Sequence, residues 1–102
     1  MSPEFAEHAA AVADLCRRHR VQRLELFGSA AVGQDDPVHS DLDFLVEFQP
    51  LPAGAYLDAY FGFLEGLHGV FGRPVDLVVD SAIRNRYFRQ SVDQTKTLLY
   101  AA

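Results

Sequence analysis

The chain has 102 residues, 49% of them hydrophobic and 23% charged, and its fourteen acidic side chains outnumber the nine basic ones. The formal charge of -5 argues against direct binding to nucleic acid or to a membrane surface, because both depend on a basic field. A chain of this length forms a single core, so we expect one domain over residues 1–102. Cys16 is the only cysteine, which excludes an internal disulfide, and no apolar run approaches the ~20 residues that span a bilayer. We therefore expect a cytoplasmic protein.

The first half of the chain predicts a helix, a strand and a loop. Residues 2–4 (SPE) supply an N-cap, a first-turn proline and an acid that suits the helix dipole, and the apolar spacing that follows predicts a helix ending near His19 or Arg20. Apolar and charged residues alternate over residues 21–27, which predicts a half-buried strand that runs directly into Gly28. Residues 28–40 combine glycine, aspartate, proline and serine and predict a loop with at most one helical turn.

The second half predicts three strands and two helices. Residues 41–48 and 75–79 are rich in leucine, valine and phenylalanine and indicate buried strands, and the longest helix lies between them over residues 55–72. We expect Asp80 and Ser81 to cap a further helix that runs to about Thr95, followed by a short strand over residues 97–100.

The longest predicted helix has a wide apolar stripe. Such a stripe indicates either a deeply buried helix or a contact with another protein or a second copy of the chain. The stripe consists of Leu57, Tyr60, Phe61, Leu64, Leu67 and Phe71, widened by Tyr56, Phe63 and Val70.

Three acids within apolar strands indicate where chemistry takes place. Asp41 and Asp43 are two residues apart on a predicted strand, so their side chains share one face. Asp76 lies among apolar residues of the next strand and completes a three-carboxylate cluster if the two strands are neighbours. Adjacent carboxylates suit a hard cation such as Mg²⁺. Asp41 alone is also compatible with a turn or cap, whereas Asp43 and Asp76 need a cation or hydrogen-bond donors to offset their desolvation.

Gly28 and Ser29 follow the first predicted strand and stand twelve residues before the first of these acids. Glycine permits a tight turn and close approach of the backbone to an anion, and a serine that opens a helical turn offers a hydroxyl and an N–H group to a phosphate oxygen. Alone, the pair is an ordinary turn. Its position before the acids makes it a candidate phosphate site.

Together these motifs resemble those of the nucleotidyltransferase superfamily typified by DNA polymerase beta, and within it the minimal nucleotidyltransferase (MNT) group. The resemblance spans about residues 21–79 and implies an α+β fold with a small mixed β-sheet and helices packed largely on one face. The segments that carry it are Gly28-Ser29, Ser40-Asp41-Leu42-Asp43 and Val75-Asp76-Leu77-Val78.

The resemblance also implies a reaction and a role for each residue. Asp41 and Asp43 would bind two Mg²⁺ ions together with ATP or another nucleoside triphosphate, and Gly28 with Ser29 would hold the triphosphate. Asp76 would share a metal and help to activate the attacking hydroxyl. The reaction would be in-line displacement at the α-phosphorus with pyrophosphate as leaving group, in which cations stabilise the attacking and departing oxygens.

One position departs from the group. MNT members often carry an arginine in the turn G-S-x-A-R-G, where this chain has Val32. The loss removes a donor to the phosphates. Three alternatives follow: Arg84, Arg86 or Arg89 substitutes from the last predicted helix, a partner supplies a cation, or the activity is weak.

The resemblance further implies a biological setting. MNT proteins are frequently paired with a small helical HEPN-domain toxin, so we expect an antitoxin that transfers AMP to a hydroxyl of its toxin. A non-catalytic antitoxin that neutralises its partner by binding alone is the alternative, favoured by Val32. Transfer to a small-molecule hydroxyl is a third interpretation, although this chain contains no acceptor-binding domain. A homodimer is also compatible with the wide apolar stripe. Among the four histidines, only His39 is expected near the nucleotide.

Overall fold

A four-stranded sheet in the order β3-β2-β1-β4 organises the computed structural model, which describes residues 3–36 and 40–102. Strand β1 pairs antiparallel with β2 and with β4, whereas β2 and β3 are parallel. The predicted mixed sheet is therefore confirmed. The strands are β1 (Val21–Phe27), β2 (Leu42–Phe48), β3 (Val75–Val79) and β4 (Thr97–Ala101).

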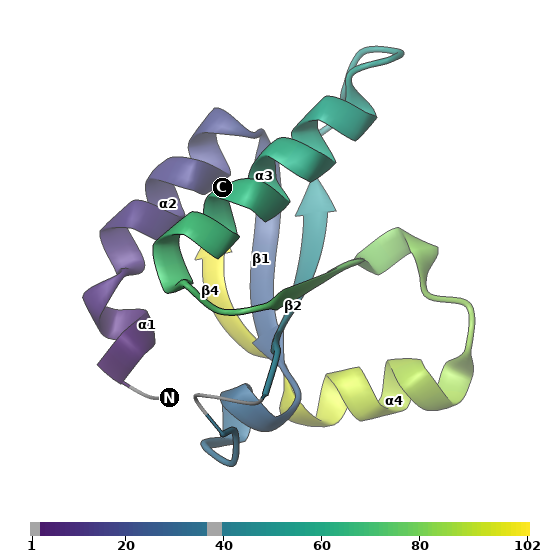
Figure 1. Cartoon of the computed structure of the whole chain (residues 1–102). Helices are drawn as coiled ribbons and strands as arrows, with labels where there is room; N and C mark the ends of the chain where they lie inside the picture. Colours follow the sequence, from purple (N-terminus) through teal and green to yellow (C-terminus); the bar gives the residue numbers. More distant parts are fainter. Residues whose placement is uncertain (1–2, 37–39) are drawn as a thin grey trace.

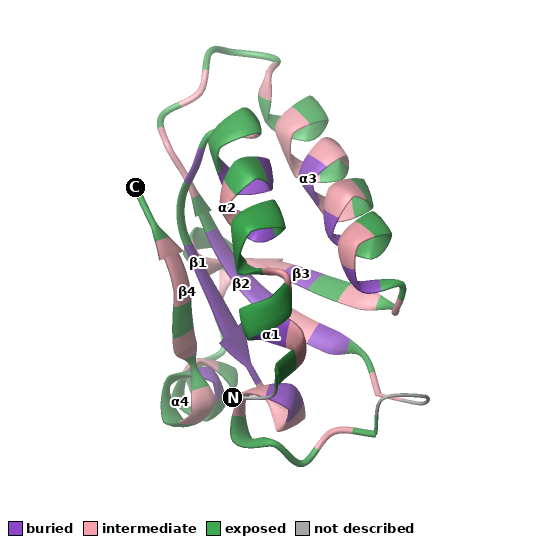
Figure 2. Cartoon of the chain, turned by 90° about the vertical axis from the view of Figure 1, so that its left-hand side faces the viewer, coloured by how far each residue is buried: buried purple, intermediate pink, exposed green. Residues whose placement is uncertain are grey.

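The helices cover the two faces of this sheet unequally. Figures 1 and 2 show α1, α2 and α3 on one face, whereas α4 lies on the other side, at the end of the sheet where β4 begins. The prediction of helices largely on one face is thus confirmed, with α4 as the exception. The helices are α1 (Pro3–Glu7), α2 (Ala9–Arg18), α3 (Tyr56–Phe71) and α4 (Arg86–Thr95), and the 3-10 turns are η1 (Ser29–Val32) and η2 (Asp80–Ala82). Within the described ranges, no helix has the length and apolar character needed to cross a membrane.

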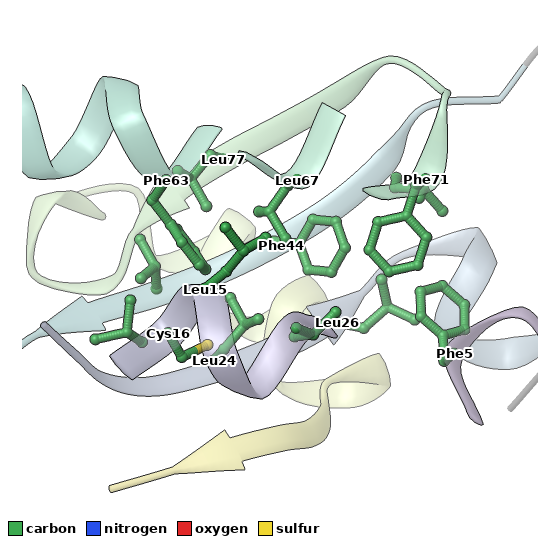
Figure 3. Close-up of a cluster of buried hydrophobic side chains, with 14 of the residues drawn as sticks. Phe5, Leu15, Cys16, Leu24, Leu26, Phe44, Phe63, Leu67, Phe71 and Leu77 are labelled. Carbon is green, nitrogen blue, oxygen red and sulfur yellow. The ribbon is translucent and has the colours of Figure 1, made fainter. Parts of the chain in front are cut away.

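Two apolar clusters fix the sheet between its helical layers. Alternation along β2 sends Phe44 into the main core beneath α2 and α3, where it packs among the residues labelled in Figure 3. The next residue, Leu45, points to the opposite face and packs with Phe27 and with Val92 of α4. Both faces of β2 are thus buried over these positions, which explains why its sequence is almost continuously apolar.

Glycines on α3 allow it to lie close to α2. A Cβ atom at Gly66 would lie 2.5 Å from a methyl carbon of Leu15, and one at Gly62 would lie 2.8 Å from the His19 ring. Side chains at these positions would force the helices apart. At Gly69 on the same helix, no described atom lies within 4 Å of the Cβ position.

Two predicted helix starts differ from the structure. The predicted N-terminal helix is divided into α1 and α2 at His8, whose backbone has a φ of -102° and a ψ of 9° and so departs from helical geometry. Its predicted cap, Ser2, lies outside the described residues. Asp80 and Ser81 do not cap the last helix but belong to η2. The cap is Asn85, whose side chain accepts hydrogen bonds from two backbone N–H groups.

The apolar stripe of α3 is only partly buried. Phe63, Leu67 and Phe71 are buried, whereas Leu57 and Phe61 are 64% and 58% exposed. Of the two interpretations of the stripe, the deeply buried helix therefore holds for only part of it, and Leu57 and Phe61 leave the contact with another protein or a second copy of the chain open. They lie on the side of α3 that turns away from the sheet.

Candidate functional site

The parallel pairing of β2 and β3 brings two of the predicted acids side by side. Asp43 of β2 and Asp76 of β3 are directly paired in the register, so their side chains leave the sheet on the same face. The neighbouring residues Phe44 and Leu77 are paired as well and point into the main core. The requirement that the two strands be neighbours is thus met, and both carboxylates lie on the face that α4 partly covers.

Asp41 stands immediately before β2, at the same end of the sheet. Asp41 and Asp76 are exposed, whereas Asp43 is half-buried. The pKa of Asp43 is raised to about 6 by burial, by the carboxylate of Asp76 and by that of Asp41. Asp41 and Asp76 therefore both lie close enough to Asp43 to act on its charge.

Gly28 lies against the same carboxylate. Strand β1 ends one residue earlier at Phe27, which pairs with Asp43. A Cβ atom at Gly28 would lie 2.6 Å from the carboxylate oxygen Oδ2 of Asp43, and the glycine has a φ of 75° and a ψ of -155°. Both the close approach and the backbone conformation exclude other residues at low energy.

Ser29 opens the 3-10 turn η1 directly after this glycine. The turn is closed by hydrogen bonds from the N–H of Ala31 to the carbonyl of Gly28, 3.1 Å, and from the N–H of Gln34 to the carbonyl of Ser29, 2.9 Å. Ser29 is half-buried, and Val32, which replaces the arginine of the MNT pattern, is 49% exposed. Gly28 and Ser29 thus lie at the same end of the sheet as the acids. His39 lies outside the described residues.

The donor chemistry of this site fits a magnesium ion bound together with a phosphate ligand. Among residues 3–36 and 40–102, no three carboxylate, imidazole or thiol groups are gathered closely enough to form a ready-made metal cage. Mg²⁺ does not need one, because it retains water and is usually held by one or two carboxylates together with substrate phosphates. Burial and the carboxylates of Asp76 and Asp41 raise the pKa of Asp43, and a bound cation would offset these effects by favouring the charged form.

The arginines considered as substitutes for Val32 are bound to other partners in this structure. Arg89 pairs with Asp80, with 2.6 Å between Nη2 and Oδ1, and also donates to the Asp80 carbonyl. Asp80 is four residues beyond Asp76, so it lies about 13 Å farther along the strand direction. Arg84 and Arg86 donate to groups of their own segments. This arrangement favours a cation from a partner, or weak activity, over substitution from α4.

Thr95 is a site neighbour that the sequence analysis missed. Its hydroxyl oxygen accepts a hydrogen bond of 2.8 Å from the N–H of Gly28, across a sequence separation of 67 residues. The bond ties the end of α4 to the glycine turn. No local sequence signal could have identified it, because a threonine at a helix end is common.

Tyr60 is a second neighbour on the other side of the acids. It donates a hydrogen bond of 2.6 Å to the carbonyl of Leu77 on β3, and its pKa is raised by burial, by Asp76 and by Tyr56. Its hydroxyl therefore lies against the edge strand β3, at the residue that follows Asp76. In the sequence it was assigned only to an apolar stripe.

Comparison with known proteins identifies the fold. Residues 10–99 match the nucleotidyltransferase domain family. The chain belongs to this family. The predicted enzyme class, a nucleotidyltransferase, is thereby confirmed.

Two relatives support the assignment at appreciable identity. A Methanocaldococcus jannaschii protein described as a candidate protein adenylyltransferase is 35% identical over 80 residues, which is 78% of each chain. A solved structure described as a candidate minimal nucleotidyltransferase is 33% identical, with a TM-score of 0.74 over 90% of this nucleotidyltransferase and 89% of that chain. The resemblance to the MNT group is therefore confirmed.

More distant structures share the fold. A chain from a toxin–antitoxin complex with AMP-PNP is 22% identical, with a TM-score of 0.69 over 92% of this nucleotidyltransferase and 73% of that chain. A chain from the complex of a tri-AMPylated Shewanella oneidensis HEPN toxin with its MNT antitoxin is 19% identical, with a TM-score of 0.64 over 96% and 73% of the two chains. At these identities the likeness concerns the fold alone.

Proposed function

We propose that this nucleotidyltransferase transfers AMP from ATP, with Mg²⁺, to a hydroxyl group of a HEPN-type toxin, and so acts as an antitoxin. The observation that carries the proposal is the direct pairing of Asp43 with Asp76, next to Gly28, which lies close to the Asp43 carboxylate because it has no Cβ atom. The names of the relatives support the choice of AMP and of the partner, since they include a candidate protein adenylyltransferase and a toxin–antitoxin complex with AMP-PNP.

The acids and the glycine turn have different roles in this reaction. Asp41 and Asp43 hold the metal together with the triphosphate, and Gly28 with Ser29 lets the backbone approach the phosphate oxygens. Asp76 would share the metal and would accept the proton of the attacking hydroxyl. The bond from the acceptor oxygen to the α-phosphorus forms while the bond to the bridging oxygen breaks, and pyrophosphate leaves. Bound cations would neutralise the charge on the phosphate oxygens.

The position of Asp76 suits a macromolecular acceptor. Strand β3 is an edge of the sheet, and Asp76 is exposed on it. An acceptor side chain on another protein can therefore reach the proposed base without entering a deep pocket. The open edge favours a protein hydroxyl over a small molecule, whose binding would need an enclosing surface.

Calorimetric titration tests the nucleotide site. We expect the protein to bind ATP in the presence of Mg²⁺ and to lose this binding both in EDTA and in the Asp41→Asn/Asp43→Asn double variant. Asp58→Asn/Asp93→Asn makes the same change in charge at exposed positions of α3 and α4 and serves as the matched control. Equal binding by both double variants would overturn the assignment of the carboxylates.

Labelled ATP tests the transfer and the acceptor. With a purified HEPN-type toxin present, label from the α-phosphate should become covalently attached to the toxin, whereas label from the γ-phosphate should not. The two labels together separate nucleotidyl transfer from phosphoryl transfer. Attachment of the γ label would contradict the proposed reaction.

The second candidate is an antitoxin that neutralises its toxin by contact alone, and the replacement of the turn arginine by Val32 favours it. The two candidates differ in the effect of Asp43→Asn. A catalytic antitoxin loses toxin neutralisation with this substitution, whereas a contact antitoxin retains it. Neutralisation of toxin activity by purified wild-type and variant proteins decides between them.

A further inference from the structure

Arg73 forms a buried charged junction outside the group of acids. Its side chain is only 9% exposed, although it carries a full positive charge. One guanidinium nitrogen donates to Glu4 of α1 at 3.0 Å, and the other donates both to Asp35 at 2.8 Å and to the carbonyl oxygen of Ser40 at 3.0 Å. Among the described residues, Nε of this arginine has no hydrogen-bond partner. Burial of this charge is costly, and the two carboxylates and the carbonyl oxygen around it offset that cost.

Backbone hydrogen bonds flank Asp41 on both sides, one from the junction and one from the β2–β3 pairing, while its side chain stays exposed. The peptide carbonyl before it, that of Ser40, accepts from Arg73, and the peptide N–H after it, that of Leu42, donates to the carbonyl of Pro74 at 3.0 Å. The two peptide groups that flank Asp41 are thus hydrogen-bonded to Arg73 and to Pro74, which are consecutive in the chain. Asp41 itself lies one residue before β2, so the pairing of β2 with β3 holds it on one side only, through Leu42.

The same segment also fixes the other acids in relation to Asp41. Pro74 leads directly into β3, where Asp76 follows two residues later and pairs with Asp43. A planar guanidinium with several donors in a fixed geometry can bind three oxygen acceptors at once, which a lysine ammonium on its flexible stem does less well. The junction therefore holds Asp41 in place relative to the two paired strands.

We propose that Arg73 is a positioning residue for the metal and nucleotide site, acting through Ser40 and the backbone of Asp41. The proposal rests on the proposed function, since it assigns a support to the same site. Residues that orient metal ligands from outside the coordination shell affect metal affinity by about 10-fold to 100-fold when they are replaced. A residue that only stabilises the fold changes the unfolding midpoint without changing the affinity of the folded fraction.

The two acidic partners of Arg73 provide matched variants. Asp35→Asn and Glu4→Gln each replace one of the two carboxylates that pair with the Arg73 guanidinium by a neutral amide. Asp35 belongs to the segment that leads towards Ser40 and Asp41, whereas Glu4 belongs to α1, on the opposite arm of the junction. A positioning role predicts unequal effects of the two variants on ligand affinity, and a purely structural role predicts effects that follow the loss of stability.

The experiment measures affinity for Mg²⁺ with AMP-PNP by calorimetry, well below each variant's unfolding midpoint, and hydrogen exchange of the backbone amides of residues 40–42. We expect Arg73→Met and Asp35→Asn to weaken binding by about 10-fold or more and to accelerate exchange at these amides, with a smaller loss in Arg73→Lys. Glu4→Gln should retain affinity within about 2-fold and loosen α1 only.

Unchanged affinity in folded Arg73→Met would overturn the proposal, as would losses in all variants that follow their stability. Failure of the proposed function looks different, because the wild type and Asp43→Asn would then both fail to bind. In that case hydrogen exchange alone decides. Unchanged exchange at residues 40–42 in Arg73→Met would show that Arg73 does not position this segment.

Discussion

The replacement of Asp43 by asparagine should stabilise the metal-free protein, although it removes a proposed metal ligand. Asp43 is half-buried and faces Asp76 directly across the parallel strand pair. Asparagine has nearly the same shape, carries no charge and can donate a hydrogen bond to a neighbouring carboxylate. The substitution therefore removes repulsion without leaving a cavity.

The expected gain follows from the pKa of Asp43, which is raised from 3.8 to about 6. A shift of this size corresponds to at most about 3 kcal/mol of unfavourable free energy in the folded state above pH 6. The side chain is partly exposed to solvent, which screens its interactions, so about 1 kcal/mol is the realistic size. For a chain of this length, that raises the unfolding midpoint by roughly 4–8 °C.

The sign of the pH dependence is also fixed. Because the folded-state pKa of Asp43 lies above its unfolded-state value, the folded protein binds the proton more tightly. The wild type therefore loses the corresponding stability as pH rises from about 4 to about 6. The advantage of Asp43→Asn should be near zero at pH 4 and complete at pH 7.5.

Urea denaturation in EDTA at pH 4, 5, 6 and 7.5 measures this difference. Asp58→Asn removes the same charge from the exposed first turn of α3 and should change stability by less than about 0.5 kcal/mol, without the same pH profile. If Asp43→Asn is no more stable than the wild type at pH 7.5, or gains no more than this control, the repulsion inferred from the register is wrong.

Addition of Mg²⁺ and AMP-PNP should reverse the order of stability. A ligand present at 100 times its dissociation constant stabilises the folded state by about 2.7 kcal/mol. The wild type receives this stabilisation and the variant does not, so the wild type becomes the more stable protein. The same carboxylate would then cost stability in the free protein and contribute to ligand binding.

Three further predictions concern the glycines and the cysteine. Gly28→Ala should destabilise the protein by about 1–3 kcal/mol and abolish nucleotide binding, because its Cβ would meet a carboxylate oxygen at 2.6 Å with a φ of 75°; denaturation and calorimetry measure the two effects. Gly66→Ala should destabilise the protein by about 1–3 kcal/mol because its Cβ would meet Leu15, whereas Gly69→Ala should stabilise it by up to about 1 kcal/mol. Equal effects of the two substitutions in thermal denaturation would contradict the close contact of α3 with α2. Cys16 is fully buried and its pKa is raised to about 12 by burial, so a thiol reagent should modify it only as fast as the protein opens, and rapid modification under native conditions would refute this.

Local patterns in the sequence were sufficient to predict most elements and the identity of the acids. Alternation and apolar runs placed the strands within one residue of their observed ends, because the inward-facing residues of a buried sheet must be apolar. Acids within such runs are costly, which is why Asp43 and Asp76 stood out before the strand order was known. Their direct pairing depends on the parallel contact of β2 and β3, which no local pattern specifies.

The supporting contacts could not be predicted for the same reason. The bond from Gly28 to Thr95 and the junction at Arg73 each connect residues that are far apart in the chain. In the sequence, Arg73 only follows the predicted helix over residues 55–72, and nothing local marks it as a junction. Helix starts were also misplaced where two signals competed, as at the last helix, where Asn85 rather than Asp80 provides the cap.

The position of the acids is secured by the apolar residues between them. A shift of β2 by one residue against β3 would bring the carboxylate of Asp43 to the face now occupied by Phe44, inside the main core. Leu45 in turn would leave its cluster with Val92 on the opposite face. Either change is costly, since a charged group would be buried and two apolar side chains would lose their contacts. The core residues on both faces of β2 therefore determine the register, and the register determines that Asp43 meets Asp76. The repulsion between these two acids persists in the free protein because the packing around them is strong enough to oppose it.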